Sequence, residues 1–287
     1  MSGHVVLVTD STAYLAPGVA DELGIVVVPL TVVMDGTSFA EGVDIDGGEV
    51  ARALESDRTV TTSRPAPAAF VEVYERLRAD GATAIVSVHL SGDISGTVDA
   101  ARLAAAEVAP SGLTVDVVDS RSLGMGMGFG VITAAKLAAA GSTPREAAQA
   151  ALRRSLNASI FMYVDTLEYL RRGGRIGAAQ AWLGSALTIK PLLNLVDGRL
   201  EPLDRVRTTE RAIARLVEVA AAEAGDDLVD IAVHHLAAAD RAEDVAQRLR
   251  AQIPALHELS VSEVGAVIGA HVGPGSVGVV VSLVEPD

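Results

Sequence analysis

The chain has 287 residues, enough for two domains of ordinary size, and 49% of them are hydrophobic, enough for a large core. Its formal net charge of −14 argues against a nucleic-acid partner, because phosphate groups repel an acidic surface. The absence of cysteine excludes disulfides, thiolate metal sites and a cysteine nucleophile. No signal-peptide pattern opens the sequence, so we expect a cytoplasmic protein.

The first half of the chain alternates short runs rich in valine and isoleucine with stretches of helical periodicity. Runs of this kind are typical of strands buried on both faces, and their alternation with helices predicts a parallel sheet covered by helices. The expected strands are residues 5–8, 24–33, 84–88 and 113–118, and the expected helices include residues 70–77, 100–104, 128–140 and 144–157.

A different order of elements follows Asn157, where we place the domain boundary. The segment 190–203 predicts a hairpin that turns at Asp197-Gly198, a strong two-residue turn signal. The sequence therefore predicts an α/β protein with a three-layer α/β/α domain and mainly parallel sheet over residues 1–157, and a two-layer α/β domain with mixed sheet over residues 158–287. Further strands are expected at residues 160–164, 228–233, 258–263 and 276–284, and helices at 209–224 and 240–251.

The segment 264–284 contains no charged residue and is long enough to span a bilayer. Its many glycines, together with His271 and Pro274, favour a loop and two buried strands over a membrane helix.

Common catalytic signatures are absent from the sequence. It has no phosphate-binding P-loop, no zinc-binding H-E-x-x-H and no G-x-S-x-G nucleophile elbow. The glycines at 124–130 have the wrong spacing for a dinucleotide fingerprint and favour close helix packing instead. His234 and His235 are neighbours on a strand and point to opposite faces, so we expect no metal site there. We also expect no cofactor.

Three segments carry candidate binding residues. Thr61–Pro67 predicts a stiff polar turn ahead of a helix, which suits either an anion or simple helix capping. Ser95-Gly96-Thr97 follows the strand 84–88, at the sheet edge where ligands of parallel sheets bind, and a capping role is again the alternative. His271 lies among glycines at 269–275, and it is either a ligand-binding group or a buried core histidine.

In this order the segments resemble the DegV family, the fatty-acid-binding subunits of bacterial fatty acid kinase. Thr62-Ser63-Arg64-Pro65 is similar to the family's Thr-Ser-Gln-Pro loop, with Arg64 in place of glutamine. The resemblance covers essentially the whole chain, and the ordered set is more specific than any one motif. The other matching segments are Val8–Thr12, Leu90–Thr97, Val118–Ser120, Gly173–Ile176, Ile189–Pro191, Asp197–Gly198 and Ile268–Gly275.

The resemblance implies a site for a fatty-acid carboxylate where the two domains meet. Its ligands would be Thr62, Ser95 and His271. The resemblance also implies that Arg175 and Arg207 dock a kinase, although both also suit a solvated surface. Supporting positions in the binding loops are Ser63, Arg64, Gly96, Thr97 and Gly269.

The implied function is to bind a long-chain fatty acid and present it to a separate ATP-dependent kinase, which forms an acyl phosphate for phospholipid synthesis. The protein itself would then be no enzyme, and transient contact with a membrane is compatible with this function. The alternative is a stand-alone enzyme, either a hydrolase using Ser95 with His271 or a phosphotransferase related to dihydroxyacetone kinase. A regulatory binding module without a kinase is a third option.

Overall fold

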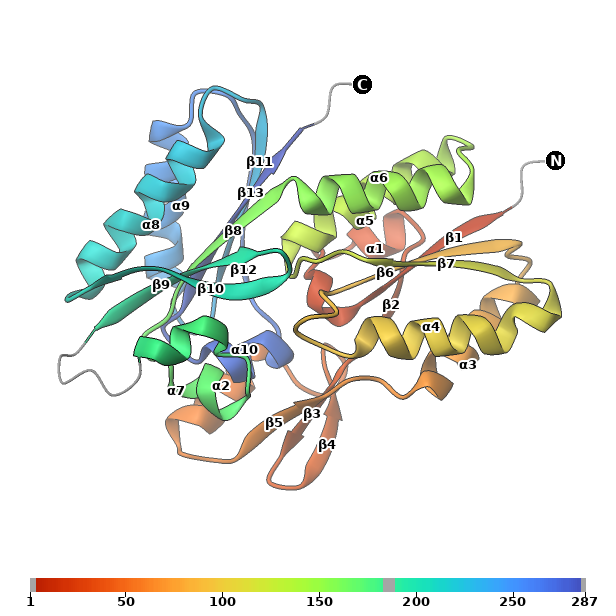
Figure 1. Cartoon of the computed structure of the whole chain (residues 1–287), viewed down its shortest axis with the longest axis horizontal. Coiled ribbons are helices and arrows are strands. Elements are labelled where there is room, and N and C mark those ends of the chain that lie inside the picture. The colour runs from red at the N-terminus through yellow and green to blue at the C-terminus, as the bar shows by residue number, and fades with distance from the viewer. Residues whose placement is uncertain (1–3, 183–188, 285–287) are drawn as a thin grey trace. The chain divides into compact units, whose positions relative to one another are not determined.

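The computed structural model describes residues 4–182 and 189–284 and divides the chain into two compact units (Figure 1). Unit 1 consists of Met1–Thr31 and Ser63–Asn157, and unit 2 consists of Val32–Thr62 and Ala158–Asp287. The division after Asn157 falls where the sequence places it, but residues 32–62 belong to unit 2 and interrupt the predicted domain 1–157.

Unit 1 contains a four-stranded parallel sheet in the order β2-β1-β6-β7. Helices α3 and α4 cover one face of it, and α5 and α6 cover the other (Figure 1). The predicted three-layer arrangement is thus confirmed. The strands are β1 (Val5–Asp10), β2 (Val26–Val28), β6 (Ala84–His89) and β7 (Thr114–Asp119), and the helices are α1 (Val19–Glu22), α3 (Pro67–Ala79), α4 (Thr97–Val108), α5 (Met125–Ala139) and α6 (Pro144–Leu156), with short 3-10 turns at Ser11–Ala13 and Ala109–Ser111.

Glycines let α5 pack closely, as the sequence predicts. A Cβ atom at Gly128 would lie 2.7 Å from the Ala13 carbonyl oxygen, and one at Gly130 would lie 2.6 Å from that of Ala151 in α6. The glycine-rich segment is therefore a packing surface between α5 and its neighbours.

Unit 2 contains a six-stranded mixed sheet in the order β10-β9-β8-β13-β11-β12, in which only the β11–β12 pair is parallel. Asp197 and Gly198 turn the β9–β10 hairpin with φ angles of 50° and 81°, which confirms the predicted turn. The strands are β8 (Ala158–Tyr163), β9 (Lys190–Val196), β10 (Arg199–Val206), β11 (Val229–His235), β12 (Leu256–Glu263) and β13 (Val277–Leu283), and the helices are α7 (Glu168–Arg172), a 3-10 segment at Gly177–Trp182, α8 (Thr209–Ala224), α9 (Ala239–Gln252) and α10 (Ala266–Val272).

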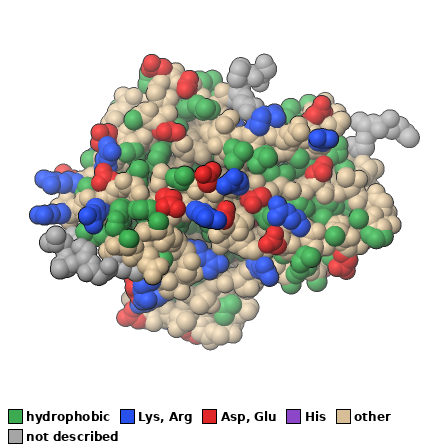
Figure 2. Space-filling model, viewed as in Figure 1, with side chains coloured by type: hydrophobic (Ala, Val, Ile, Leu, Met, Phe, Trp, Pro, Cys, Tyr) green, Lys and Arg blue, Asp and Glu red, His purple; other side chains and the backbone are tan. Residues whose placement is uncertain are grey.

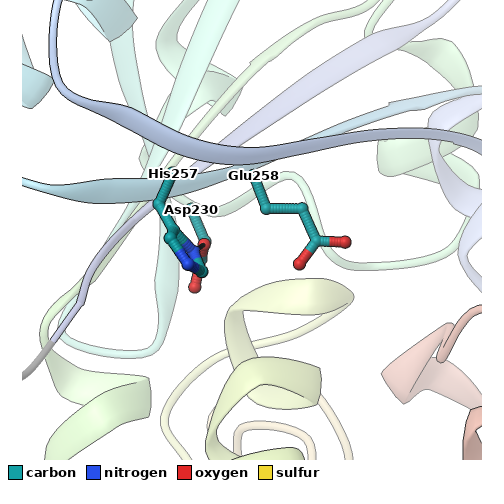
Figure 3. Close-up of side chains that lie close together, drawn as sticks. All are labelled: Asp230, His257 and Glu258. Carbon is teal, nitrogen blue, oxygen red and sulfur yellow. Dashed lines mark hydrogen bonds and ion pairs between the residues drawn. The ribbon is translucent and has the colours of Figure 1, made fainter. Parts of the chain in front are cut away.

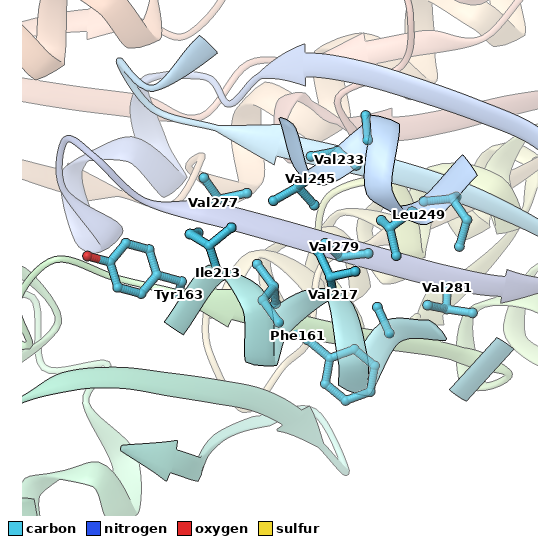
Figure 4. Packing of buried hydrophobic residues seen from close by; sticks show 14 of the residues in the cluster. Phe161, Tyr163, Ile213, Val217, Val233, Val245, Leu249, Val277, Val279 and Val281 are labelled. Carbon is cyan, nitrogen blue, oxygen red and sulfur yellow. The ribbon is translucent and has the colours of Figure 1, made fainter. Parts of the chain in front are cut away.

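The core of unit 2 lies between this sheet and the helices α8 and α9 (Figure 4). Alternate strand residues such as Phe161, Val233 and Val279 point into it and meet Val217 and Leu249 from the helices. Their neighbours along each strand point to the opposite face of the sheet. The core is therefore built mainly from aliphatic side chains, as the low aromatic content requires.

Residues 32–62 join unit 2 because they pack against the segment that leads into α10. They contribute β3 (Thr31–Met34), β4 (Thr37–Ala40) and α2 (Gly47–Glu55), and β5 (Val60–Ser63) completes a three-stranded sheet. A Cβ atom at Gly47 would lie 2.0 Å from the Val264 carbonyl oxygen, so only glycine permits this approach. Local sequence carries no signal for such a long-range contact.

Two predicted elements are wrong in detail. The run 24–33 divides into β2 and β3, because Pro29 has no N–H group to continue a strand. The segment 264–284 forms α10 followed by β13, where a loop and two strands were expected, so His271 lies on a helix. Among the described residues, no helix combines the length and apolar character needed to cross a bilayer.

Candidate functional site

Thr62 and His271 lie side by side within unit 2, although 209 residues separate them in the sequence. Thr62 stands near the end of β5, and His271 belongs to the last turn of α10. The Thr62 Oγ1 atom lies 2.7 Å from His271 Nε2, at hydrogen-bond distance. The structure therefore brings together two of the three predicted carboxylate ligands, which we call the Thr62–His271 pair.

The His271 ring packs directly against the backbone of Gly173. A Cβ atom at Gly173 would lie 2.0 Å from His271 Nδ1, and this nitrogen is buried with no hydrogen-bond partner in the described part of the chain. Burial, followed by the positive charge of Arg175, lowers the pKa of His271 to about 4. The imidazole is therefore neutral near pH 7 and acts as a hydrogen-bonding group.

Arg175 and Arg207 occupy different surroundings in unit 2. Arg175 is half-buried, and its Nη1 donates to the Gly173 carbonyl oxygen at 2.6 Å, close to the His271 ring. Arg207 is exposed between β10 and α8, where Thr208 caps the helix. Their predicted role in docking a kinase stays a prediction.

Ser95 belongs to unit 1, in the loop between β6 and α4. Its Oγ lies 2.9 Å from Thr97 Oγ1, and its N–H donates to the Ser91 carbonyl oxygen at 3.0 Å. The capping interpretation is wrong here, because the N-cap residue of α4 is Gly96 and no side chain caps the helix. Ser95 as a carboxylate ligand stays a prediction.

Arg64 fills the space beside Gly96 in unit 1. A Cβ atom at Gly96 would lie 2.1 Å from Arg64 Nη1, which donates to the Gly96 carbonyl oxygen at 3.5 Å. The backbone that was expected to face a ligand thus meets the guanidinium in this structure. Gly269, another predicted supporting position, instead packs against Leu236 in unit 2.

The predicted polar turn ahead of α3 is also different in the structure. Thr62 and Ser63 are strand residues of β5, and Ser63 Oγ donates to the Arg64 carbonyl oxygen at 3.2 Å. The N-cap residue of α3 is Ala66, followed by Pro67, and no side chain caps it. The hydroxyls of Thr62 and Ser63 therefore do not cap α3.

A buried polar chain in unit 1 was missed from the sequence. His89 Nδ1 lies 3.0 Å from Asp10 Oδ2, His89 Nε2 lies 2.7 Å from Ser87 Oγ, and Ser87 Oγ lies 2.8 Å from the Tyr74 hydroxyl. All four residues are fully buried, and burial raises the pKa of Tyr74 to about 12. The order Asp–His–Ser matches a catalytic triad, but a substrate cannot reach the buried Ser87. The chain is structural.

A second network, in unit 2, holds the loop that follows α10. Asp165 accepts hydrogen bonds from the Tyr163 hydroxyl and from Lys190 Nζ, the latter at 2.8 Å. Burial alone would raise the pKa of Asp165, but the hydrogen bonds from Lys190 and Tyr163 lower it. Arg241 packs over the Tyr163 ring and donates to the Gly275 carbonyl oxygen. The network therefore holds the backbone at Gly275, four residues after His271, in place.

Three potential metal ligands lie together on β11 and β12 (Figure 3). His257 Nδ1 is 2.7 Å from Asp230 Oδ1, and the ligand atoms of both and of Glu258 lie within 4.8 Å of one another. The side chain of His257 is 56% exposed. The hydrogen bond to Asp230 accounts for its position, and we assign no metal to this group.

Comparison with known proteins identifies a family. The family model described as "Uncharacterised protein, DegV family" matches residues 4–283. A DegV domain-containing protein of Streptomyces coelicolor is 57% identical over 282 residues, which cover 98% of this chain and 99% of that protein.

Two solved structures resemble the chain over almost its whole length. The first, described as fatty acid binding of a DegV family protein from Thermus thermophilus, has a TM-score of 0.90, is 34% identical and covers 98% of this chain and 100% of its own. The second, described as DegV, a fatty acid binding protein from Bacillus subtilis, has a TM-score of 0.89, is 30% identical and covers 99% and 100%. With the family match across residues 4–283, these similarities show that the chain belongs to the DegV family.

Proposed function

We propose that this protein binds one long-chain fatty acid through its carboxylate at the Thr62–His271 pair. The observation that carries the proposal is the 2.7 Å contact between Thr62 Oγ1 and His271 Nε2. It is supported by two relatives at 34% and 30% identity that are described as fatty-acid-binding proteins.

The chemistry of the pair suits an ionised carboxylate. A carboxylate only accepts hydrogen bonds, and a threonine hydroxyl can donate to it while accepting from a neutral imidazole. Such a charge-assisted hydrogen bond is roughly twice as strong as a neutral one. Because His271 is neutral at pH 7, it can support Thr62 without carrying a charge of its own.

The same residues argue against a serine hydrolase. The histidine of a catalytic triad uses one ring nitrogen for the serine and holds a carboxylate on the other. In this protein His271 Nε2 is engaged by Thr62, and His271 Nδ1 has no hydrogen-bond partner among residues 4–182 and 189–284. The ring therefore lacks the orienting group that this chemistry requires.

The face of the unit 2 sheet opposite α8 and α9 carries aliphatic side chains of the kind that suit an acyl chain. Met162 pairs with Leu193 on one side and with Gly278 on the other, and Ile160 pairs with Val280. The four side chains in these pairs are all buried and lie outside the α8/α9 core. Burying a long chain would contribute roughly 10 kcal/mol at about 0.8 kcal/mol per methylene, against association costs on the order of 4–15 kcal/mol. Short acids should therefore bind poorly.

Mass spectrometry of extracted lipid tests the binding proposal. Purified protein should release a long-chain fatty acid in near-equimolar ratio after denaturation, and Thr62→Val and His271→Leu should release much less. Thr37→Val is the matched control, because Thr37 lies on β4 in the same three-stranded sheet but is exposed. Ser95→Ala tests the third predicted ligand in the same way. An empty wild-type protein that also fails to bind added oleate or palmitate would refute the proposal.

We further propose that a separate ATP-dependent kinase phosphorylates the bound carboxylate, and that Arg175 and Arg207 contribute to its docking. Exposed arginines are concentrated near Arg207 in a chain whose net charge is −14, and Lys and Arg side chains gather at the left of Figure 2, where β10 leads into α8. These neighbours are Arg205 and Arg211.

A charge reversal tests the docking proposal. With the kinase and ATP present, Arg207→Glu should abolish acyl phosphate formation while oleate affinity stays at the wild-type value. Arg145→Glu, on the exposed face of α6 in unit 1, is the control with the same charge change. Equal phosphorylation of the two variants would contradict a role for Arg207.

A further inference from the structure

Glu41 places a buried carboxylate at the start of α10. The residue is 4% exposed, and its Oε1 accepts a hydrogen bond from the Val267 N–H at 2.7 Å. The N-cap residue of α10 is Gly265, which offers no side chain. Glu41 thus supplies from 226 residues away the capping interaction that a local side chain usually provides.

The position of α10 depends on contacts of this kind. A helix of seven residues is too short to be stable alone, so tertiary contacts must fix its ends. Val267 lies in the first turn and His271 in the last turn of this short, rigid rod, which is about 10 Å long. A displacement at the start of the helix therefore moves the His271 ring.

Glu41 and Thr62 belong to the same segment of the chain. Glu41 is held by a β-bridge to Ile45, and the neighbouring Gly42 N–H donates to the Ile45 carbonyl oxygen at 3.0 Å. Thr62 follows on β5, which pairs in the same three-stranded sheet as β4. The segment 32–62 therefore touches the first turn of α10 through Glu41 and the last turn through Thr62.

We propose that Glu41 is a positioning residue for the Thr62–His271 pair. Its carboxylate fixes the first turn of α10 and thereby sets the distance between the His271 ring and the Thr62 hydroxyl. The consequence for ligand affinity rests on the proposed function, whereas the consequence for the ring itself does not.

Nitrogen-15 NMR of the histidine rings tests this directly, because the shift of a ring nitrogen reports its hydrogen bonding. The six histidines are labelled in the intact, ligand-free protein, and the His271 signals are assigned from their loss in His271→Leu. Thr62→Val gives the reference for a ring without its hydroxyl partner. Oleate affinity is measured on the same samples.

Glu41→Ala should shift the His271 Nε2 signal toward its position in Thr62→Val and weaken oleate binding about tenfold, the effect of losing one buried hydrogen bond. Glu41→Gln keeps an acceptor oxygen at the same reach and should restore both values. Glu49→Ala is the matched control, since Glu49 caps α2 in the same segment but is exposed and belongs to the capping box of that helix.

A folded Glu41→Ala protein with a wild-type His271 signal would overturn the proposal. If this variant does not fold, Glu41→Asp replaces it: the acceptor is withdrawn by one methylene, and an unshifted His271 signal would overturn the proposal equally. A shifted ring in Glu41→Ala, combined with a wild-type protein that binds no oleate, would support the positioning role and refute the fatty-acid function.

Discussion

The adjacent glycines 173 and 174 serve two different physical needs. Gly173 has an ordinary φ of −75°, but a side chain there would collide with the His271 ring. Gly174 has open space around it, but its φ of +71° strains any other residue. One glycine is required by a neighbour and the other by the backbone.

Substituting each glycine separates the two needs. Gly173→Ala should displace His271 and weaken oleate binding by about tenfold or more, because the partly buried hydrogen bond between Thr62 and His271 is lost. Gly174→Ala should instead lower the free energy of unfolding by roughly 1 kcal/mol with unchanged affinity. Titration calorimetry and urea unfolding on both variants provide the two readings. Equal losses of affinity would contradict this division.

The lowered pKa of His271 makes stability depend on pH. Its folded value of about 4 lies below the 6.5 of an unperturbed histidine, so the unfolded chain binds more protons between these values. This contribution is complete above pH 6.5 and is lost as the pH falls toward 4. Relative to His271→Gln, the wild type should lose on the order of 3 kcal/mol of unfolding free energy over this range. Urea unfolding at several pH values measures it, with the exposed His4→Gln as control.

At the scale of elements, the buried chain around Asp10 ties two loops at the carboxyl edge of the unit 1 sheet. Besides His89, Asp10 accepts from the N–H groups of Thr12 and Leu90, each at 3.1 Å. It thereby joins the turn after β1 to the loop after β6, which carries Ser95. A carboxylate buried in this way is stabilised by hydrogen bonds in place of water.

Removing that carboxylate should be costly. Asp10→Ala leaves several buried donors without an acceptor and should lower the unfolding free energy by about 3–5 kcal/mol. Asp99→Ala, whose ion pair with Arg102 is exposed, should cost less than about 1 kcal/mol. Denaturant unfolding compares the two variants, and similar losses would show that the buried chain contributes little.

Elements with strong local signals could be predicted from the sequence, whereas elements held by distant contacts could not. The helix at residues 209–224 has the predicted bounds, because an apolar stripe and a threonine cap both define it locally. α10 was expected to be a loop, because its glycine and β-branched residues are poor helix formers and its cap comes from Glu41. The Thr62–His271 contact followed only from the family resemblance, since no local pattern links the two residues.

At the scale of the whole chain, each compact unit is built from two stretches that are separate in the sequence. Residues 32–62 depart from unit 1 after β2 and return to it before α3. The boundary at Asn157 could be predicted because the order of elements changes there. The assignment of residues 32–62 to unit 2 could not be predicted, since the short strands and α2 of this segment resemble ordinary connections within an α/β domain.

Residues 32–62 should lose stability together with the rest of unit 2. Leu216→Ala removes a fully buried side chain from the α8/α9 core and should cost about 2–5 kcal/mol. Native-state hydrogen exchange should then show lower opening free energies for residues 32–62 as well as for 158–182 and 189–284, with residues 63–157 unchanged. Leu77→Ala in the core of unit 1 should give the reverse pattern. If Leu77→Ala lowered the opening free energies of residues 32–62, their assignment to unit 2 would be contradicted.

The contact between Glu41 and Val267 also has a consequence for synthesis on the ribosome. At about 5–20 residues per second, the 226 residues between them take roughly 10–45 s to emerge. During that time the segment 32–62 is out of the ribosome while its partner helix does not yet exist. All residues of unit 1 have been synthesised once Asn157 is added, so unit 1 can fold long before unit 2 does. Residues 32–62 then remain unpaired with the rest of unit 2. The Thr62–His271 pair is therefore among the last features of the nascent chain to form.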